Sequence, residues 1–289
     1  MSVPVGEAAW RRTNLGHLLF AATGACIAVK LRVAREAGFA GVTDAQLALF
    51  QAITPGGTRL TTLAAGAGLA KQSMIELVDR AERQGLVVRT PDPADRRAKL
   101  VGPTRRGLAL RRAALAGLAE AERGFAAAVG AGNVPAIRRA LAAFGPNSAA
   151  GVGLETALAH AGRRFVRDVL GAVHLHGYAE VTEALLALFR TLELGGSRLT
   201  EVAGAARITK QSMRVLVDRA VAMGLVERAL DPADRRARTI AFSPAGLVML
   251  EEMRGGIVAA EAGFAAAASE TTLHDLKRWL SEFTSTAIV

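Results

Sequence analysis

One long internal repeat constrains the fold of this chain more than any other feature. Residues 58–99 and 197–238 align without a gap, 139 positions apart, and both contain the strings KQSM and DPADRRA. The same offset extends upstream, from 38–57 to 177–196, and downstream, where Phe125 and Phe144 align with Phe264 and Phe283. Self-similarity at a fixed offset indicates a duplicated structural unit. We therefore expect two domains, 1–144 and 154–289, joined by a linker at 145–153 that is rich in helix-breaking and small residues.

Each copy is expected to be mainly α-helical with a small β-hairpin. Hydrophobic residues make up 51% of the chain and aromatic residues 4%, a balance that favours helices over sheets. In the first copy, helices are expected at about 15–37, from Thr43 to the glycines at 56–57, from Thr61 to 66–68, and at 71–84, 107–129 and 134–144. Thr43 and Gln46 form an expected capping box, and Thr61 an expected cap. Strands are expected at 86–89 and 98–101, on either side of a turn at 91–95.

The helix expected at 71–84 carries residues suited to reading DNA bases. Its apolar positions share one face and are expected in the core. Its polar N-terminus is the part of a recognition helix that enters the major groove, where Lys suits guanine, Gln suits adenine and Ser suits either. In a single copy, a solvated helix start would account for the same residues equally well. The predicted base-contacting residues of the two copies are Lys71, Gln72, Ser73, Lys210, Gln211, Ser212 and Arg214.

The expected hairpin turn carries two adjacent arginines in each copy. Beside a helix-turn-helix, such arginines are placed to reach a minor groove, whose narrow A·T-rich form attracts inserted arginine. Alone, the turn would indicate only a surface ion pair of small energy. It follows the KQSM helix at the same spacing twice, however, which favours DNA binding. The predicted wing residues are Asp95, Arg96, Arg97, Lys99, Asp234, Arg235, Arg236 and Arg238.

Together, the KQSM helix and the DPADRR turn resemble the MarR family of winged helix-turn-helix regulators. The resemblance covers about residues 15–144 and 154–283 and rests on the family's Asp-x-Arg wing, which is followed by an L-T-x-x-G step that opens a long helix. It implies that Arg97 and Arg236 enter the minor groove and that Asp95 and Asp234 orient them. The helix-opening step is looser here, at 103–107 and 243–246.

A second departure from the family is that one chain contains both modules. Family members dimerise through the first and last helices of single-module chains. The resemblance therefore implies a covalent pseudo-dimer of two tandem winged helix-turn-helix modules, monomeric as a chain, that reads two operator half-sites roughly 34–36 Å apart. Ile75 and Glu76 align with Arg214 and Val215, so an imperfectly palindromic operator is expected.

The resemblance further implies a small aromatic or otherwise hydrophobic effector, bound between the dimer helices and the reading module, that releases DNA. Candidate lining residues are Trp10, His17 and Phe20 in the first copy and His160, His174, His176 and Tyr178 in the second. No cofactor or metal is expected, because two histidines at i and i+2 do not share a helical face and lack a third ligand. The apolar surroundings of Cys26 and the lack of a second cysteine argue against a redox sensor.

Charge and cysteine content constrain the partners and the compartment. The formal net charge of +10 suits a polyanionic partner, and residues 1–144 hold 20 Lys+Arg and 10 Asp+Glu, whereas residues 145–289 hold 16 of each. A single cysteine fits a cytoplasmic protein. His17 and Gly24 interrupt the N-terminal apolar stretch, unlike a signal peptide. No run reaches the ~18 apolar residues of a membrane helix, so no membrane partner is expected.

Three functional hypotheses follow from the sequence. The first is a cytoplasmic, ligand-responsive repressor that binds specific double-stranded DNA. The second is a protein-interaction or ligand-sequestering module without specific DNA binding, which the intact KQSM and DRR strings in both copies argue against. The third is a sequence-neutral DNA binder that contacts phosphates only. An enzyme is not expected, since the sequence lacks GxSxG, P-loop, CxxC and HExxH motifs.

Overall fold

A computed structural model describes residues 10–67, 69–144, 153–206, 208–230 and 238–286. The chain forms two compact units that do not coincide with the two sequence repeats. Unit 1 comprises residues up to Ala22 together with Gly132–Ser285, and unit 2 is centred on Thr23–Ala131. Each unit contains one winged helix, and unit 1 also contains both ends of the first repeat.

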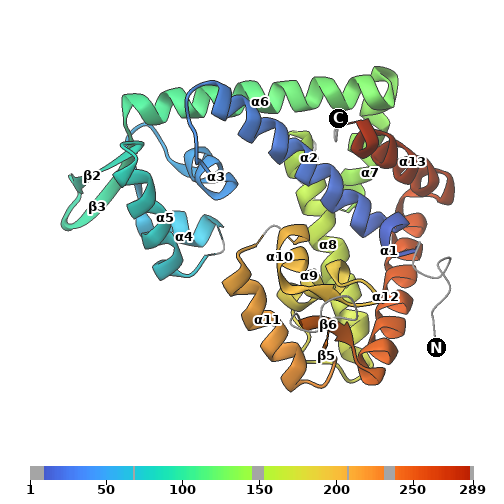
Figure 1. Cartoon of the computed structure of the whole chain (residues 1–289). Coiled ribbons are helices and arrows are strands. Elements are labelled where there is room, and N and C mark those ends of the chain that lie inside the picture. Colours follow the sequence, from blue (N-terminus) through green and yellow to red (C-terminus); the bar gives the residue numbers. More distant parts are fainter. Residues whose placement is uncertain (1–9, 68, 145–152, 207, 231–237, 287–289) are drawn as a thin grey trace. The chain divides into compact units, whose positions relative to one another are not determined.

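Unit 2 holds the winged helix of the first repeat (Figure 1). Helix α2 begins in unit 1 and continues into unit 2 from residue 23. The elements in chain order are α2 (Leu15–Glu36), α3 (Asp44–Ala52), β1 (Thr58–Arg59), α4 (Leu60–Ala67), α5 (Lys71–Arg83), β2 (Val87–Asp92), β3 (Asp95–Pro103) and α6 (Arg105–Val129). The antiparallel sheet has the order β1-β3-β2, with Thr58 opposite Val101. Its core packs α3, α5 and α6 together through buried Phe50, Met74 and Leu110.

Unit 1 holds the winged helix of the second repeat and both ends of the first (Figure 1). From the first repeat it contains α1 (Trp10–Thr13), the start of α2, and α7 (Val134–Ala143), which follows the 3-10 turn η2 (Ala131–Asn133). From the second repeat it contains α8 (Leu154–Leu175), α9 (Glu183–Thr191), β4 (Ser197–Arg198), α10 (Leu199–Ala205), α11 (Lys210–Ala222), β5 (Val226–Leu230), β6 (Arg238–Phe242), α12 (Pro244–Ala268) and α13 (Glu270–Thr286). Its sheet has the matching order β4-β6-β5.

The two ends of the first repeat are integral to unit 1. Helix α7 packs on α8 and α12, and the rings of Phe144 and Phe264 lie 4.5 Å apart. The backbone N–H of Leu15 donates to Glu261 Oε1 at 2.6 Å, and Lys277 Nζ lies 2.9 Å from the same oxygen. The core of this unit is therefore built from residues of both repeats.

Two glycines at equivalent positions show that the long helix of each repeat begins in the same way. A Cβ on Gly107 would lie 2.0 Å from the Leu86 carbonyl oxygen, and a Cβ on Gly246 would lie 1.8 Å from that of Leu225. Only glycine allows such an approach without a backbone shift. Each long helix can thus pack directly against the residue that leads into its wing.

The expectation of a mainly helical fold with small sheets is confirmed. The Thr43–Gln46 capping box is present. The prediction that Thr61 caps a helix was wrong, because α4 begins at Leu60, directly after β1. Helix α3 ends at Ala52, before the glycine pair, and β2 and β3 are longer than expected because they pair nearly to the turn. Strand β1 was not anticipated, since two residues become a strand only by pairing with β3.

Helix α2 is long and apolar enough to cross a membrane by length and composition alone. This is weak evidence, because a core helix or a signal sequence meets the same criterion. Leu15, Leu19 and Ala22 on this helix are at most 1% exposed, as is Cys26. These four side chains of the helix therefore belong to the core.

Candidate nucleic-acid interface and effector pocket

The N-terminal turns of α5 and α11 present the predicted base-reading residues to solvent. The exposed set is Lys71, Gln72, Ser73, Lys210, Gln211, Ser212 and Arg214. Behind them, Met74 and Met213 are at most 1% exposed and fix each helix to its core. Helix α11 is capped by Thr209, whose hydroxyl oxygen accepts the N–H of Ser212 at 3.0 Å. The polar faces are thus free to meet a partner while the apolar faces are buried.

An ion pair ties each of the helices α5 and α11 to a wing strand of the same unit. In unit 2, Arg89 on β2 pairs with Asp79 on α5 at 2.5 Å and also with Glu82. In unit 1, the equivalent Arg228 pairs with Asp218 on α11. These contacts link the strand to the helix in the same register, so the helix and wing of each module are positioned together.

The wing of unit 2 is organised by two aspartates. Asp92 has a side chain 6% exposed and pairs with Arg59 on β1 at 2.6 Å. Its Oδ1 accepts the N–H of Ala94 at 2.8 Å, and this hydrogen bond, with Arg59, lowers the pKa of Asp92. Asp95 Oδ1 accepts the backbone N–H of Arg97 at 3.0 Å, so it shapes the turn through the main chain. Both aspartates lie at the tip of the hairpin, where Asp92 ties the end of β2 to Arg59 of β1 and Asp95 closes the turn.

Arg97 and Lys99 are exposed on this wing. Within the described residues, the Arg97 guanidinium forms no ion pair, and the Asp95 carboxylate is bonded to the Arg97 main chain. Of the second wing, Arg238 is exposed at the start of β6, whereas Asp234, Arg235 and Arg236 lie outside the described residues.

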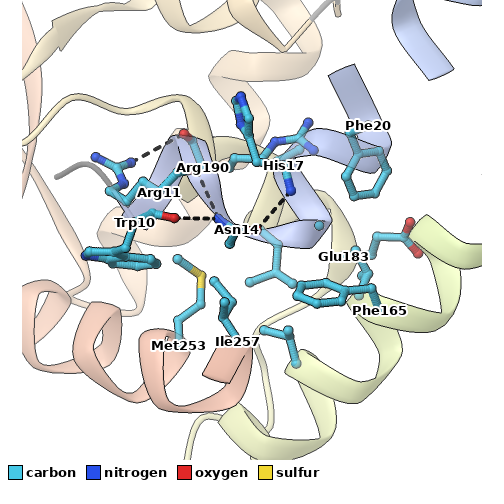
Figure 2. Close-up of a pocket in the computed structure, with 15 residues that line it drawn as sticks. Trp10, Arg11, Asn14, His17, Phe20, Phe165, Glu183, Arg190, Met253 and Ile257 are labelled. Atoms are coloured by element: carbon cyan, nitrogen blue, oxygen red, sulfur yellow. Dashed lines mark hydrogen bonds between the residues drawn. The ribbon is translucent and has the colours of Figure 1, made fainter. Parts of the chain in front are cut away.

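Unit 1 contains a cavity of about 130 Å³ formed by both repeats (Figure 2). The start of the first repeat contributes one wall, and α8, α9 and α12 of the second repeat contribute the others. The lining residues are Trp10, Arg11, Asn14, Gly16, His17, Phe20, Phe165, Val166, Val169, Glu183, Leu186, Ala187, Arg190, Met253 and Ile257. Figure 2 shows His17 and Phe20 on one side and Met253 and Ile257 on the other. The cavity is largely apolar, with a few charged groups at its margin.

Arg11 fixes the first repeat to the end of α9. Its guanidinium donates to the carbonyl oxygens of Phe189 and Leu192, both at 2.6 Å, and the residue is 8% exposed. Helices end with unpaired carbonyls, which a buried arginine satisfies well. Asn14 holds the turn between α1 and α2, since its side chain donates to the Trp10 carbonyl and accepts the His17 N–H, each at 2.9 Å.

Arg190 provides positive potential at one side of the cavity, next to His17. The Arg190 guanidinium lies 4.5 Å from the centre of the Phe20 ring, and within the described residues no carboxylate pairs with it. Burial lowers the pKa of Arg190. The pKa of His17 is lowered by burial and then by Arg190 and Arg12, so its neutral form is favoured. An anionic group in the cavity would raise the pKa values of both Arg190 and His17, because it stabilises their charged forms.

The structure brings Trp10, His17 and Phe20 together in this cavity, but not the other four candidates. His174 Nε2 bonds to the Val181 carbonyl and His176 Nδ1 to the Ala172 carbonyl, both at 2.8 Å. His160 Nδ1 is buried without a partner in the described chain, and neither His160 nor Tyr178 lines the cavity. Among the described residues there is no group of three His, Cys, Asp or Glu side chains that could hold a metal ion.

Sequence reasoning missed Arg11, Asn14 and Arg190, which line the cavity, and the Arg59–Asp92 pair of the wing. The cavity residues come from segments nearly 180 positions apart, so no local pattern links them. Arg59 and Asp92 lie on β1 and β2, which pair with β3 and not with each other. The one available signal was an arginine within an otherwise apolar helix, at residue 190.

Residues 40–98 match the model of the MarR family. This segment covers about a fifth of the chain, from the residues before α3 to the wing of unit 2, and it supports the resemblance described above for that module. A comparison with curated proteins finds no significant match.

Several solved structures are similar to parts of the chain. A transcriptional regulator from Thermotoga maritima is 35% identical over 31% of this chain, with a TM-score of 0.28, and the match spans only 62% of that protein. CouR from Rhodococcus jostii RHA1, bound to p-coumaroyl-CoA, is 27% identical over 48% of this chain and 93% of its own, with a TM-score of 0.38. CouR bound to a 23-mer DNA duplex is 26% identical over 49% of this chain and 97% of its own, with a TM-score of 0.40.

Proposed function

We propose that this chain is a cytoplasmic transcriptional regulator of the MarR type that binds specific double-stranded DNA as a covalent pseudo-dimer. Its two modules, 1–144 and 154–289, joined at 145–153, each read one half-site. The recognition helices α5 and α11 enter successive major grooves, and the arginine wings reach the flanking minor grooves. The repressor releases DNA when a small aromatic or otherwise hydrophobic effector binds.

The observation that carries this proposal is the repeated pairing of an exposed KQS helix start with a wing. Lys71, Gln72 and Ser73 are all exposed, as are the equivalent residues of α11. Both helices are tied to their wing strands by equivalent arginines, Arg89 and Arg228. The same exposed helix start and the same ion pair to the wing occur in both modules. This duplication fits a target that presents two similar half-sites.

The packing within unit 1 supports an intrachain pseudo-dimer. The first and last helices of repeat 1 pack with α8 and α12 of repeat 2, as shown by the Phe144–Phe264 and Leu15–Glu261 contacts. These are the elements through which the family resemblance implies dimerisation. A chain that satisfies its own dimer contacts needs no second copy, because the partner is present at high effective concentration.

The unit 1 cavity supports the effector part of the proposal. An apolar cavity of roughly 150 Å³ holds one benzene ring, and this one is slightly smaller, at about 130 Å³. The Arg190 guanidinium, which lies in the cavity against the Phe20 ring, favours an anionic substituent on such a ring. The cavity lies against α9, which packs on recognition helix α11, so occupancy can be transmitted to the DNA-reading surface.

The test is a titration of the full chain against the duplex upstream of its own coding sequence and a shuffled duplex, each at two salt concentrations. The proposal predicts a preference of about 10³-fold or more for the native duplex. Arg97→Ala should weaken that binding by about tenfold. It should also reduce the slope of log K against log salt concentration by about 1. Arg254→Ala, which removes an exposed arginine of α12, serves as the matched control and should bind like the parent.

Two outcomes would contradict the proposal in different ways. Equal binding to both duplexes that disappears at high salt would indicate a sequence-neutral phosphate binder. No binding to either duplex would indicate a protein-interaction or ligand-sequestering module.

A further inference from the structure

The basic and aromatic side chains that line the cavity of unit 1 are not repeated at the equivalent sequence positions. The walls of this cavity come from the start of repeat 1 and the body of repeat 2. The residues at equivalent positions, 139 residues away, therefore lie in the start of repeat 2 and the body of repeat 1. At the equivalent positions, 139 residues away, Arg11 is replaced by Ala150, His17 by Thr156, Phe20 by Ala159 and Arg190 by Gln51. The basic and aromatic groups of the cavity are therefore present once per chain.

A buried lysine occupies another of these equivalent positions. Lys30 corresponds to Val169, which lines the cavity, and both backbones pack against a glycine of the long helix. A Cβ on Gly117 would lie 2.8 Å from the Lys30 Cα, and one on Gly256 would lie 3.6 Å from the Val169 Cα. The two positions thus share a backbone environment but differ in side chain.

The Lys30 side chain links α2 to α3. These helices are the equivalents of α8 and α9, which flank the cavity in the second repeat. The Lys30 side chain is 3% exposed, and its Nζ lies 3.2 Å from Asp44 Oδ1 at the start of α3. Asp44 corresponds to Glu183, which lines the cavity at the start of α9. Unit 2 therefore joins α2 to α3 by an ion pair at positions that, in unit 1, border a cavity between α8 and α9.

The helix that borders the cavity is connected to the second recognition helix. One face of α9 lines the cavity with Glu183 and Arg190, and its opposite face is buried through Leu185 and Leu188. Helix α9 packs on α11, and Arg219 of α11 donates to the Glu180 carbonyl just before α9 at 3.2 Å. A ligand that displaced α9 would therefore act first on α11.

The two repeats also differ in net charge. Residues 1–144 carry all of the excess positive charge, whereas residues 145–289 carry 16 basic and 16 acidic residues. Binding that depends on phosphate contacts scales with the number of cations that meet the backbone. The first repeat, whose winged helix does not border the cavity, is thus the one better suited to hold DNA.

We infer that the two halves are specialised. The first winged helix anchors the chain on DNA, and the second responds to a single effector molecule bound in the unit 1 cavity. This inference rests on the proposed function and deepens it, because a homodimer of identical modules would carry two equivalent effector sites. Effector binding removes the second module from its half-site while the first remains bound.

Benzoate is a suitable probe, because it combines one ring of the size of the cavity with one carboxylate for Arg190. Titration calorimetry on the full chain should give one site per chain. Arg190→Gln, which copies the residue at the equivalent position of repeat 1, should weaken benzoate binding by about tenfold or more, since a charge-assisted contact is lost. Arg254→Gln, in an exposed arginine outside the cavity, should leave it unchanged.

Footprinting on the native duplex then distinguishes the two halves. Saturating benzoate should remove protection from the half-site of the second module and leave that of the first. Two benzoate sites per chain, a site insensitive to Arg190→Gln, or loss of both half-sites together would overturn the inference. Absence of benzoate binding would also overturn it, while leaving intact the DNA selectivity measured without benzoate, on which the proposed function stands separately.

Discussion

Replacing Arg11 with methionine tests whether the start of repeat 1 is a structural part of the second winged helix. Its guanidinium donates to the carbonyl oxygens of Phe189 and Leu192, both at 2.6 Å, at the end of α9. Methionine keeps much of the apolar length of the side chain but donates no hydrogen bond. We expect the free energy of unfolding of unit 1 to fall in Arg11→Met.

The size of the effect follows from two opposing contributions. Hydrogen bonds to a charged group contribute about 1.5–3 kcal/mol each, so the two strong ones supply roughly 3–6 kcal/mol. Against this, Arg11 is 8% exposed, and its Nε is buried without a partner in the described residues. Removing that desolvated group recovers about 1–3 kcal/mol. The net loss is about 2–3 kcal/mol, or roughly 5 °C or more in Tm.

Tryptophan fluorescence during urea and thermal unfolding measures this change selectively, because both tryptophans of the chain, Trp10 and Trp279, lie in unit 1. Arg12→Met is the matched control, since Arg12 is adjacent, its side chain is 73% exposed, and it makes a surface ion pair with Glu193. Surface pairs contribute at most about 1 kcal/mol. If Arg11→Met and Arg12→Met both lowered the free energy of unfolding by the same small amount, the docking of α1 on α9 would be refuted.

Three further predictions follow from individual contacts. Gly246→Ala should destabilise unit 1 by more than about 2 kcal/mol in urea unfolding, because its Cβ would lie 1.8 Å from a main-chain carbonyl oxygen. Gly255→Ala, in the same helix with no atom within 4 Å, should instead stabilise it by about 0.5–1 kcal/mol. Burial lowers the pKa of His17 in the folded chain, so the unfolded chain binds more protons and stability falls as pH drops below about 6.5. His17→Gln should therefore reduce the loss of unit 1 stability between about pH 7 and 5, and an unchanged pH profile would contradict this. Asp92→Asn should speed hydrogen exchange at the Ala94 amide, which donates to Asp92 at 2.8 Å, and an unchanged rate would show that the wing does not depend on this carboxylate.

Local signals in the sequence predicted the helices well. The capping box at Thr43 and the glycine at 85, with φ of +67°, mark a helix start and a helix end through interactions within a few residues. The recognition helices were predicted because apolar residues at helical spacing face the core wherever the helix packs. Strand β1 was missed because its two residues have no strand pattern of their own and depend on β3, more than 40 positions away.

The lining of the unit 1 cavity was predicted only in part for the same reason. Trp10 lies on α1, and His17 and Phe20 lie on α2, at the start of the repeat, whose place the family resemblance implies. Arg190 was missed because its role depends on the packing of Phe20 against it, across 170 positions of sequence. His174 was included for its chemistry, but its ring nitrogen bonds to the Val181 carbonyl and leaves it outside the cavity.

The number of chains bound to one operator tests the account most directly. The full chain would be mixed with the duplex upstream of its coding sequence, and the mass of the complex measured by light scattering and native mass spectrometry. The account predicts one chain per duplex, with protection of two half-sites roughly one helical turn, about 34–36 Å, apart. Two chains per duplex, or one chain that protects a single half-site, would contradict a pseudo-dimer made within one polypeptide.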